Sequence, residues 1–255
     1  MSRLLEFEAL TVHIADDVDE MARDAAVDAA AWLRAVIEER GEANVMLATG
    51  NSQLLFLVEL VRMPGVAWDR VRAFHMDEYV GLVPSHAASF QRYMRERVAA
   101  HLPVMEFHYL TGDAPDPEVE AARYEALLRA HPLDLCCAGI GENGHLAFND
   151  PPVADFDDPR AVKVVPLDDA SRRQQVGEGH FASIDEVPTH AITVTIPALL
   201  AAHRVLVIVP EARKARAVRA ALHGEISTAC PASILRRRSN ATLYLDPESS
   251  ALLDS

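Results

Sequence analysis

Short apolar runs alternate with longer segments of helical period along most of the chain, and no other feature limits the fold as strongly. We expect the apolar runs to be strands and the longer segments to be helices. The strands are predicted at 45–48, 71–74, 133–138, 191–196, 204–209 and 242–245, and the helices at 18–40, 54–61, 89–100, 117–130 and 211–222. This alternation predicts a Rossmann-like α/β fold, in which helices flank a mostly parallel sheet.

The first predicted helix carries clear start and stop signals. Acidic residues Asp16 and Asp17 precede it, and Gly41 follows it. Acids favour the positive end of the helix dipole, and glycine is the residue that most often ends a helix. We therefore place the helix between these residues.

Length and charge narrow the function. The chain has 255 residues, enough for one large domain, which we expect to cover 1–255. The net charge is −14 and the only dense basic run is at 236–238, so we expect no nucleic acid partner.

The three cysteines indicate reduced, buried thiols. Because no apolar run resembles a signal peptide or a membrane span, we predict a cytoplasmic protein without a membrane partner.

The stretch from 149 to 187 interrupts the alternation of strands and helices. It contains Asp-Pro-Pro, Phe-Asp-Asp-Pro and Gly-Glu-Gly, with one short strand-like run at 161–165. A long irregular insertion of this kind is more often a lid or a binding loop than a second domain. We therefore predict one domain that carries a lid.

Residues 139–144 match the G-x-G-x-x-G pattern of dinucleotide-binding loops. That pattern requires a long helix after the last glycine and an acid at the end of the next strand. Pro151 and Pro152 end any such helix within two turns, and Asp157 and Asp158 lie in a loop. We therefore expect a catalytic turn here and no dinucleotide.

His145 is the candidate acid–base group that this turn presents. Histidine titrates near neutral pH, so it can both donate and accept a proton. Asn143 lies two residues before it, and Asp150, five residues after it, can hold its tautomer and stabilise the imidazolium. A single histidine usually has a structural role. A histidine that lies at a strand end, between glycines and an acid, is more often functional.

Two other turns follow predicted strands, where ligands bind in open parallel sheets. The first turn consists of Thr49, Gly50, Asn51 and Ser52. Its glycine and the free amides of the next helix favour an anion, although a simple capped turn explains it equally well. The second turn carries Asp77 and Glu78, which a solvated turn would also tolerate. A partly desolvated carboxylate there can act as a general base.

Two motifs of this chain resemble a known family closely. The runs Met-Asp-Glu-Tyr-Val-Gly-Leu (76–82) and Gly-Ile-Gly-Glu-Asn-Gly-His-Leu-Ala-Phe-Asn-Asp-Pro (139–151) resemble the glucosamine-6-phosphate deaminase/isomerase family, whose fold the 6-phosphogluconolactonases share. Leu-Ala-Thr-Gly (47–50) and Arg-Lys-Ala (213–215) extend the resemblance over nearly the whole chain. The two long motifs together are specific, whereas Thr-Gly alone is not.

The resemblance implies that glucosamine 6-phosphate and water become fructose 6-phosphate and ammonia, without a metal or cofactor. It implies that His145 opens the pyranose ring, that Asp77 moves the C2 proton to C1, and that Asp150, in place of a glutamate, orients His145. The phosphate would be held by Lys214 and the turn at 49–52. Three further positions inside the motifs are assigned to the site, Asn143 as catalytic and Glu78 and Gly144 as substrate-binding.

The chain also departs from the family pattern. Asn51 stands where the family often has a second glycine, and Asn143 where some members have aspartate. The family's phosphate-binding arginine falls in a segment that contains Arg172 and Arg173, and we expect Arg172 or Arg173 to take its role. Pro-Val-Ala (152–154) replaces paired serines of an allosteric site, so allosteric activation by an N-acetylated sugar phosphate is not expected.

Two other functions remain open at this point. Hydrolysis of 6-phosphogluconolactone needs a histidine-activated water but no C2 base, and lactonases typically have Asp-Glu-Arg where this chain has Asp-Glu-Tyr (77–79). A sugar-phosphate-binding regulator without catalysis fits the altered phosphate turn, but the intact Asp77 and His145 favour an enzyme. The sequence leaves open a gluco- or galacto-configured substrate and a monomer or homo-oligomer.

Overall fold

An eight-stranded sheet forms the centre of the molecule in this computed structural model, which describes residues 2–253, the side chain at 170 excepted. Its strands are β1 (Arg3–Phe7), β2 (Leu10–Ile14), β3 (Ala43–Leu47), β4 (Val71–His75), β6 (Glu106–His108), β7 (Leu135–Ala138), β10 (Arg204–Val209) and β11 (Ala241–Leu245). The strand order is β1-β2-β11-β10-β7-β3-β4-β6, and every neighbouring pair except β1 and β2 is parallel. The predicted α/β fold with a mostly parallel sheet is confirmed.

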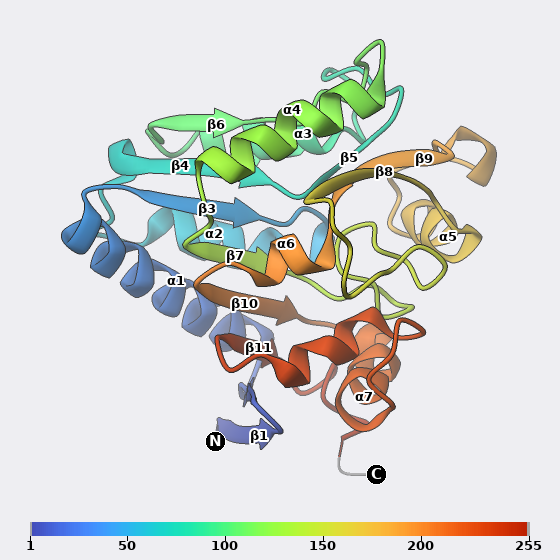
Figure 1. Ribbon diagram of the computed structural model, residues 1–255. Coiled ribbons are helices and arrows are strands. Elements are labelled where there is room, and N and C mark those ends of the chain that lie inside the picture. The colour runs from blue at the N-terminus through green and yellow to red at the C-terminus, as the bar shows by residue number, and fades with distance from the viewer. Residues whose placement is uncertain (1, 254–255) are drawn as a thin grey trace.

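Helices cover both faces of this sheet (Figure 1). The helices of the described residues include α1 (Val18–Arg40), α2 (Leu54–Arg62), α3 (Phe90–Met94), α4 (Pro117–Ala130), α6 (Ile196–Leu200) and α7 (Ala215–His223), and also α5 (Asp169–Gly177), which belongs to the insertion and does not cover the central sheet. Helices α1 and α2 pack on one face, and α4, α6 and α7 pack on the other. Because successive strand side chains point to opposite faces, Cys136 lies in one core and Cys137 in the other. Within residues 2–253, no helix has the length and apolar character that a membrane crossing requires.

The boundaries of α1 agree with its sequence signals. The Asp17 side chain accepts a hydrogen bond of 2.7 Å from the backbone N–H of Glu20 and so caps the start of the helix. Gly41 ends it with a φ of 85°, a left-handed conformation that glycine adopts without steric cost.

A second, antiparallel sheet lies beyond the carboxyl ends of the central strands. It contains β5 (Asp77–Tyr79), β9 (His190–Val194) and β8 (Val162–Pro166), in that order. We expected the run at 191–196 to belong to the parallel sheet. Instead it forms β9, because the chain leaves β4 after His75 and pairs β5 with β9, with Asp77 opposite Thr193.

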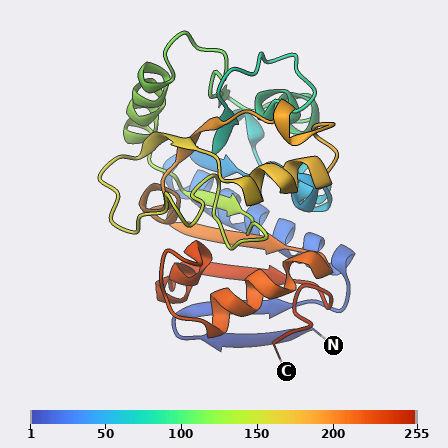
Figure 2. The same cartoon turned by 90° about the vertical axis from the view of Figure 1, so that its right-hand side faces the viewer.

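The insertion at 149–187 is more regular than the sequence indicates. It contains β8 and the helix α5, whose N-cap Asp168 accepts a hydrogen bond of 2.8 Å from the N–H of Ser171. The helix is polar along most of its length, so hydrophobic periodicity does not reveal it. Figure 2 shows α5 and the small sheet in front of the central strands, on the side toward which the arrowheads of Figure 1 point.

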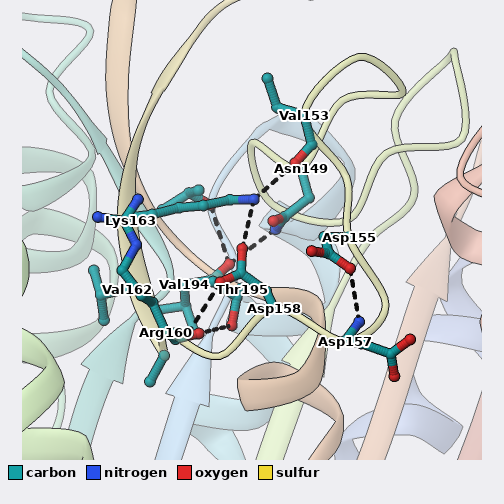
Figure 3. A network of polar contacts seen from close by, with 12 residues as sticks. Asn149, Val153, Asp155, Asp157, Asp158, Arg160, Val162, Lys163, Val194 and Thr195 are labelled. Atoms are coloured by element: carbon teal, nitrogen blue, oxygen red, sulfur yellow. Dashed lines mark hydrogen bonds and ion pairs between the residues drawn. The ribbon is translucent and has the colours of Figure 1, made fainter.

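A buried lysine fixes the loop that leads from Asn149 into the small sheet (Figure 3). The Nζ atom of Lys163 lies 2.7 Å from the carbonyl oxygen of Val153 and 2.9 Å from Oδ2 of Asp158. Asn149 is fully buried, and its side-chain amide donates to the carbonyl oxygen of Val194. These contacts fix the backbone next to Asp150, which follows Asn149 in the chain.

Candidate active site

A pocket opens at the carboxyl ends of the central strands, where ligands bind in open parallel sheets. Its wall is formed by the turns after β3, β4, β7 and β10 together with the insertion. Seven of the predicted site residues line it, namely Thr49, Gly50, Asn51, Ser52, Asp77, His145 and Lys214. The insertion adds Gln174, Gln175 and Glu178, which the sequence analysis did not assign to the site. Segments far apart in the chain thus meet in one pocket.

The His145 ring is held from behind by a buried carboxylate. Its Nδ1 atom lies 2.9 Å from Oδ1 of Asp150, which is fully buried. The Asn143 amide donates to the same oxygen over 3.0 Å, and its own oxygen accepts the N–H of His145 over 3.1 Å. Burial acts to raise the pKa of Asp150, but its hydrogen bonds, first that from His145, lower it below the ordinary value. Because the ionised Asp150 contacts Nδ1 of His145, the other ring nitrogen, Nε2, is available to a ligand in the pocket.

Ser171 of the lid helix α5 completes this group. Its hydroxyl donates a hydrogen bond of 2.5 Å to Oδ1 of Asp150 and lies 3.2 Å from Nδ1 of His145. Ser171 was not among the predicted site residues. The signal that could have found it is the Asp-x-x-Ser spacing of Asp168 and Ser171, which predicts a helix start in the insertion.

Two glycines of the turn are required by close packing. A Cβ atom at Gly141 would lie 2.2 Å from the ring of His145. Gly144 has a φ of +86°, and a Cβ atom there would lie 2.7 Å from Sγ of Cys230. Gly144 is not part of the pocket wall. The structure thus gives Gly144 a role in the turn that positions His145.

Asp77 begins β5 and brings a carboxyl group into the pocket wall. The residue is 6% exposed, and its Oδ1 atom is buried without a hydrogen-bond partner among the described residues. Burial raises the pKa of Asp77 well above its ordinary value, and the charge of Glu78 raises it further. A carboxylate of this kind is a stronger base than a solvated one.

The adjacent Glu78 has a structural role, which corrects its assignment to substrate binding. Its carboxylate accepts hydrogen bonds from the Ser89 hydroxyl and the Gln91 N–H, both 2.8 Å, and from the Phe90 N–H at 3.2 Å. It thus anchors the start of α3 and is 1% exposed, outside the pocket wall. Burial raises the pKa of Glu78, although these hydrogen bonds oppose the rise.

Lys214 and the turn at 49–52 form one end of the pocket. Gly50 has a φ of +99°, and its carbonyl oxygen accepts a hydrogen bond of 2.9 Å from the Tyr93 hydroxyl. Lys214 is 3% exposed and forms no ion pair with any residue in the range 2–253. Burial, and secondly the charge of Arg213, lower the pKa of Lys214 to about 8. An ammonium group without a partner in a pocket is suited to an anion.

Arg172 lies outside the pocket wall. Its NH2 atom donates to the carbonyl oxygens of Ile184 and Val187, at 2.6 and 3.1 Å, and so closes the end of the insertion. Arg173 is exposed, with Asp169 as its partner. In this arrangement Arg172 is engaged by carbonyl oxygens of the insertion, and neither arginine lines the pocket.

The fold and the site together define an α/β protein equipped for acid–base chemistry on a small ligand. The model of the glucosamine-6-phosphate isomerases/6-phosphogluconolactonase family matches residues 16–244, and the chain belongs to this family. The resemblance found in its motifs is thereby confirmed.

Relatives and solved structures agree with this membership. The chain is 37% identical to a glucosamine-6-phosphate deaminase of Bacillus cereus over 217 residues, which are 85% of this chain and 80% of that protein. A monomeric glucosamine-6-phosphate deaminase of solved structure has a TM-score of 0.86 and 31% identity, covering 94% of this chain and 99% of its own. A 6-phosphogluconolactonase from Trypanosoma brucei shares the fold at 17% identity, with a TM-score of 0.76 and coverage of 98% and 100%.

Proposed function

We propose that this protein deaminates and isomerises an amino-sugar 6-phosphate, with glucosamine 6-phosphate as the first candidate. One observation carries the proposal: the buried carboxyl group of Asp77 and the ring of His145 line the same pocket, while Asp150 holds His145 from outside it. An aldose–ketose conversion needs one group that opens the ring and a second that moves a proton between neighbouring carbons. The pocket offers one candidate for each task.

His145 and Asp77 act in successive steps of the proposed reaction. His145 donates a proton from Nε2 to the ring oxygen and accepts the proton of the C1 hydroxyl, which opens the pyranose to the aldehyde. Asp77 then removes the proton from C2 while His145 returns a proton to O1, which forms an enolamine, and Asp77 delivers its proton to C1. The C2 iminium that results reacts with water, and the products are fructose 6-phosphate and ammonia.

Lys214 and the turn at 49–52 are the proposed site of the phosphate. Lys214 supplies an ammonium group, and the turn supplies the hydroxyl-bearing residues Thr49 and Ser52. Asn143 and Asp150 do not contact the ligand in this proposal. They position His145, as Ser171 does.

The relatives support deamination over lactone hydrolysis. The relatives that are 31% and 37% identical to the chain are deaminases, whereas the neighbours named as lactonases are 15 to 19% identical and support the fold alone. The residues assigned to the reaction all belong to one chain, and one relative is described as monomeric, so we propose that a monomer suffices for activity. We also propose a cytoplasmic location, where sugar phosphates are available.

The test is an assay that follows ammonia and fructose 6-phosphate together during incubation with glucosamine 6-phosphate. We expect equal amounts of the two products. Galactosamine 6-phosphate, run in parallel, decides the configuration of the sugar. Hydrolysis of 6-phosphogluconolactone in place of deamination would contradict the proposal, and saturable binding without turnover of any of these compounds would favour a regulator.

A further inference from the structure

The residue that ends α5, Glu178, places a carboxylate in the pocket wall near Lys214. Its side chain is 6% exposed, and Oε1 accepts hydrogen bonds from Arg213 at 2.7 Å and from Gln174 at 2.8 Å. Its Oε2 atom lies 3.4 Å from Nε2 of His180. Burial acts to raise the pKa of Glu178, but these contacts, first that of His180, lower it to about 2. Glu178 is therefore a fixed negative charge at neutral pH.

The guanidinium group of Arg213 pairs with Glu178, but it neutralises this charge only in part because three carboxylates share it. Arg213 contacts three carboxylates, those of Glu142 at 3.2 Å, Glu178 at 2.7 Å and Glu211. It is not part of the pocket wall. Among the described residues that line the pocket, Lys214 thus supplies the one ammonium or guanidinium group.

The Lys214 end of the pocket combines attraction and repulsion for an anion. Lys214 attracts negative charge. Glu178 opposes it, and it does so from the C-terminus of α5, where the helix dipole is also negative. A phosphate dianion carries two negative charges and no hydrogen that it could donate to Glu178. A monoanion matches Lys214 without the second repulsion.

We infer that Glu178 is a specificity-determining residue, which makes the Lys214 end of the pocket prefer a ligand group with one negative charge over a phosphate dianion. The inference rests on the proposed function for the position of the phosphate. The substrate phosphate then binds as its monoanion, and its remaining P–OH group donates a hydrogen bond to Glu178. This role is the opposite of that expected for the phosphate-binding arginine, Arg172 or Arg173, in the same segment.

The test compares two unreactive ligands by isothermal titration calorimetry at pH 7.5, glucitol 6-phosphate and glucitol 6-sulfate. The phosphate ester is mostly dianionic at this pH because its second pKa is about 6, whereas the sulfate ester carries one charge. We expect the native protein to bind the sulfate at least as tightly as the phosphate. The Glu178→Gln variant should bind the phosphate about tenfold more tightly than the native protein does, with a much smaller change for the sulfate.

Two further variants serve as controls. Glu142→Gln removes a charge that also contacts Arg213 but lies outside the pocket wall, so the affinities for the two esters should change little. Glu178→Asp keeps the charge and should keep the native order of the two affinities. Thermal unfolding of each variant checks that it is folded.

Three outcomes would overturn the inference. They are a native protein that prefers the phosphate by about tenfold or more, a Glu178→Gln variant with an unchanged ratio of affinities, and absence of binding by both esters. The measurement needs no turnover. A native protein that preferred the sulfate but released no ammonia from glucosamine 6-phosphate would therefore end the proposed function and leave the inference intact.

Discussion

The hydroxyl of Ser171 lies 2.5 Å from Oδ1 of Asp150, although the two residues belong to different structural elements. Ser171 lies in the lid helix α5, and Asp150 lies in the loop that follows the His145 turn. The same hydroxyl is 3.2 Å from Nδ1 of His145. The position of the lid is thereby linked to the orientation of the group that we assign to ring opening.

Replacement of Asp150 by asparagine should reduce turnover strongly. Asparagine has a similar shape but lacks the charge that stabilises the His145 imidazolium, so we expect kcat to fall on the order of 100-fold. Because the folded-state pKa of Asp150 is lowered, its charge stabilises the fold above the unfolded pKa of about 3.9, and this contribution is lost as pH falls through the folded value. Asp150→Asn should therefore lower Tm more at pH 7 than in acid. An equal loss of Tm at all pH values would contradict this reasoning.

Ser171→Ala tests whether the lid hydroxyl positions His145. We expect kcat to fall about tenfold, with a changed pH profile, because Asp150 loses one of its hydrogen-bond donors. Ser171→Thr keeps the hydroxyl and should recover most of the activity and the native profile. If the alanine and threonine variants behaved alike in pH dependence, Ser171 would be a packing residue only.

Asp77→Asn should abolish exchange of the C2 proton with deuterium from the solvent, measured by NMR on the substrate. The same variant should gain stability at neutral pH. The folded-state pKa of Asp77 is raised, so its ionisation destabilises the fold as pH rises above about 3.9. We expect a Tm above that of the native protein at pH 7 and equal to it near pH 3. Unchanged deuterium exchange would remove Asp77 from the proposed role.

The neighbouring Glu78 provides a contrast to Asp77. Glu78→Ala leaves the Ser89 hydroxyl and the Phe90 and Gln91 amides without their acceptor, so the free energy of unfolding should fall by about 1–3 kcal/mol. C2 exchange should persist in the folded protein. Chemical denaturation measures the first effect, and retained stability would show that water replaces the carboxylate.

Substrate affinity should weaken at alkaline pH because of Lys214. Burial and the charge of Arg213 lower its pKa to about 8, so the ammonium loses its proton above that pH and no longer attracts the phosphate. We expect the Kd of glucitol 6-sulfate, whose single charge does not change with pH, to rise between pH 7.5 and 9.5, and Lys214→Met to show a high Kd that is independent of pH in this range. A native Kd that stays constant to pH 9.5 would exclude Lys214 as the anion ligand.

Gly141→Ala should impair catalysis by steric displacement of His145. Its Cβ atom would lie 2.2 Å from the ring, so the ring must move, and we expect kcat to fall on the order of 100-fold. Gly177→Ala is the matched control, because a Cβ atom there meets no atom within 4 Å. It should keep full activity and raise Tm slightly, as alanine favours helix over glycine. Full activity in Gly141→Ala would mean that the ring is free to shift without loss.

The hydrophobic pattern predicted the central fold because apolar residues recur with a different period in its strands and in the helices that flank them. The helices α1 and α4 follow their apolar stripes and end signals closely. The same method missed α5, whose side chains are mostly polar, and it assigned the run of β9 to the wrong sheet. Sheet partners depend on where the chain turns after β4, and periodicity carries no information on that turn.

The amino-acid sequence was enough to predict that polar turns follow buried strands, and that His145, Asp77 and Lys214 belong to the motifs of one family. Which side chains meet in the pocket became visible in the folded chain. Folding turned Glu78 into an anchor of α3, engaged Arg172 with lid carbonyls, and placed Ser171 and Glu178 at the site. The physical reason is that motifs lie on turns fixed by local backbone geometry, whereas the lid residues take their roles from contacts between segments distant in the chain.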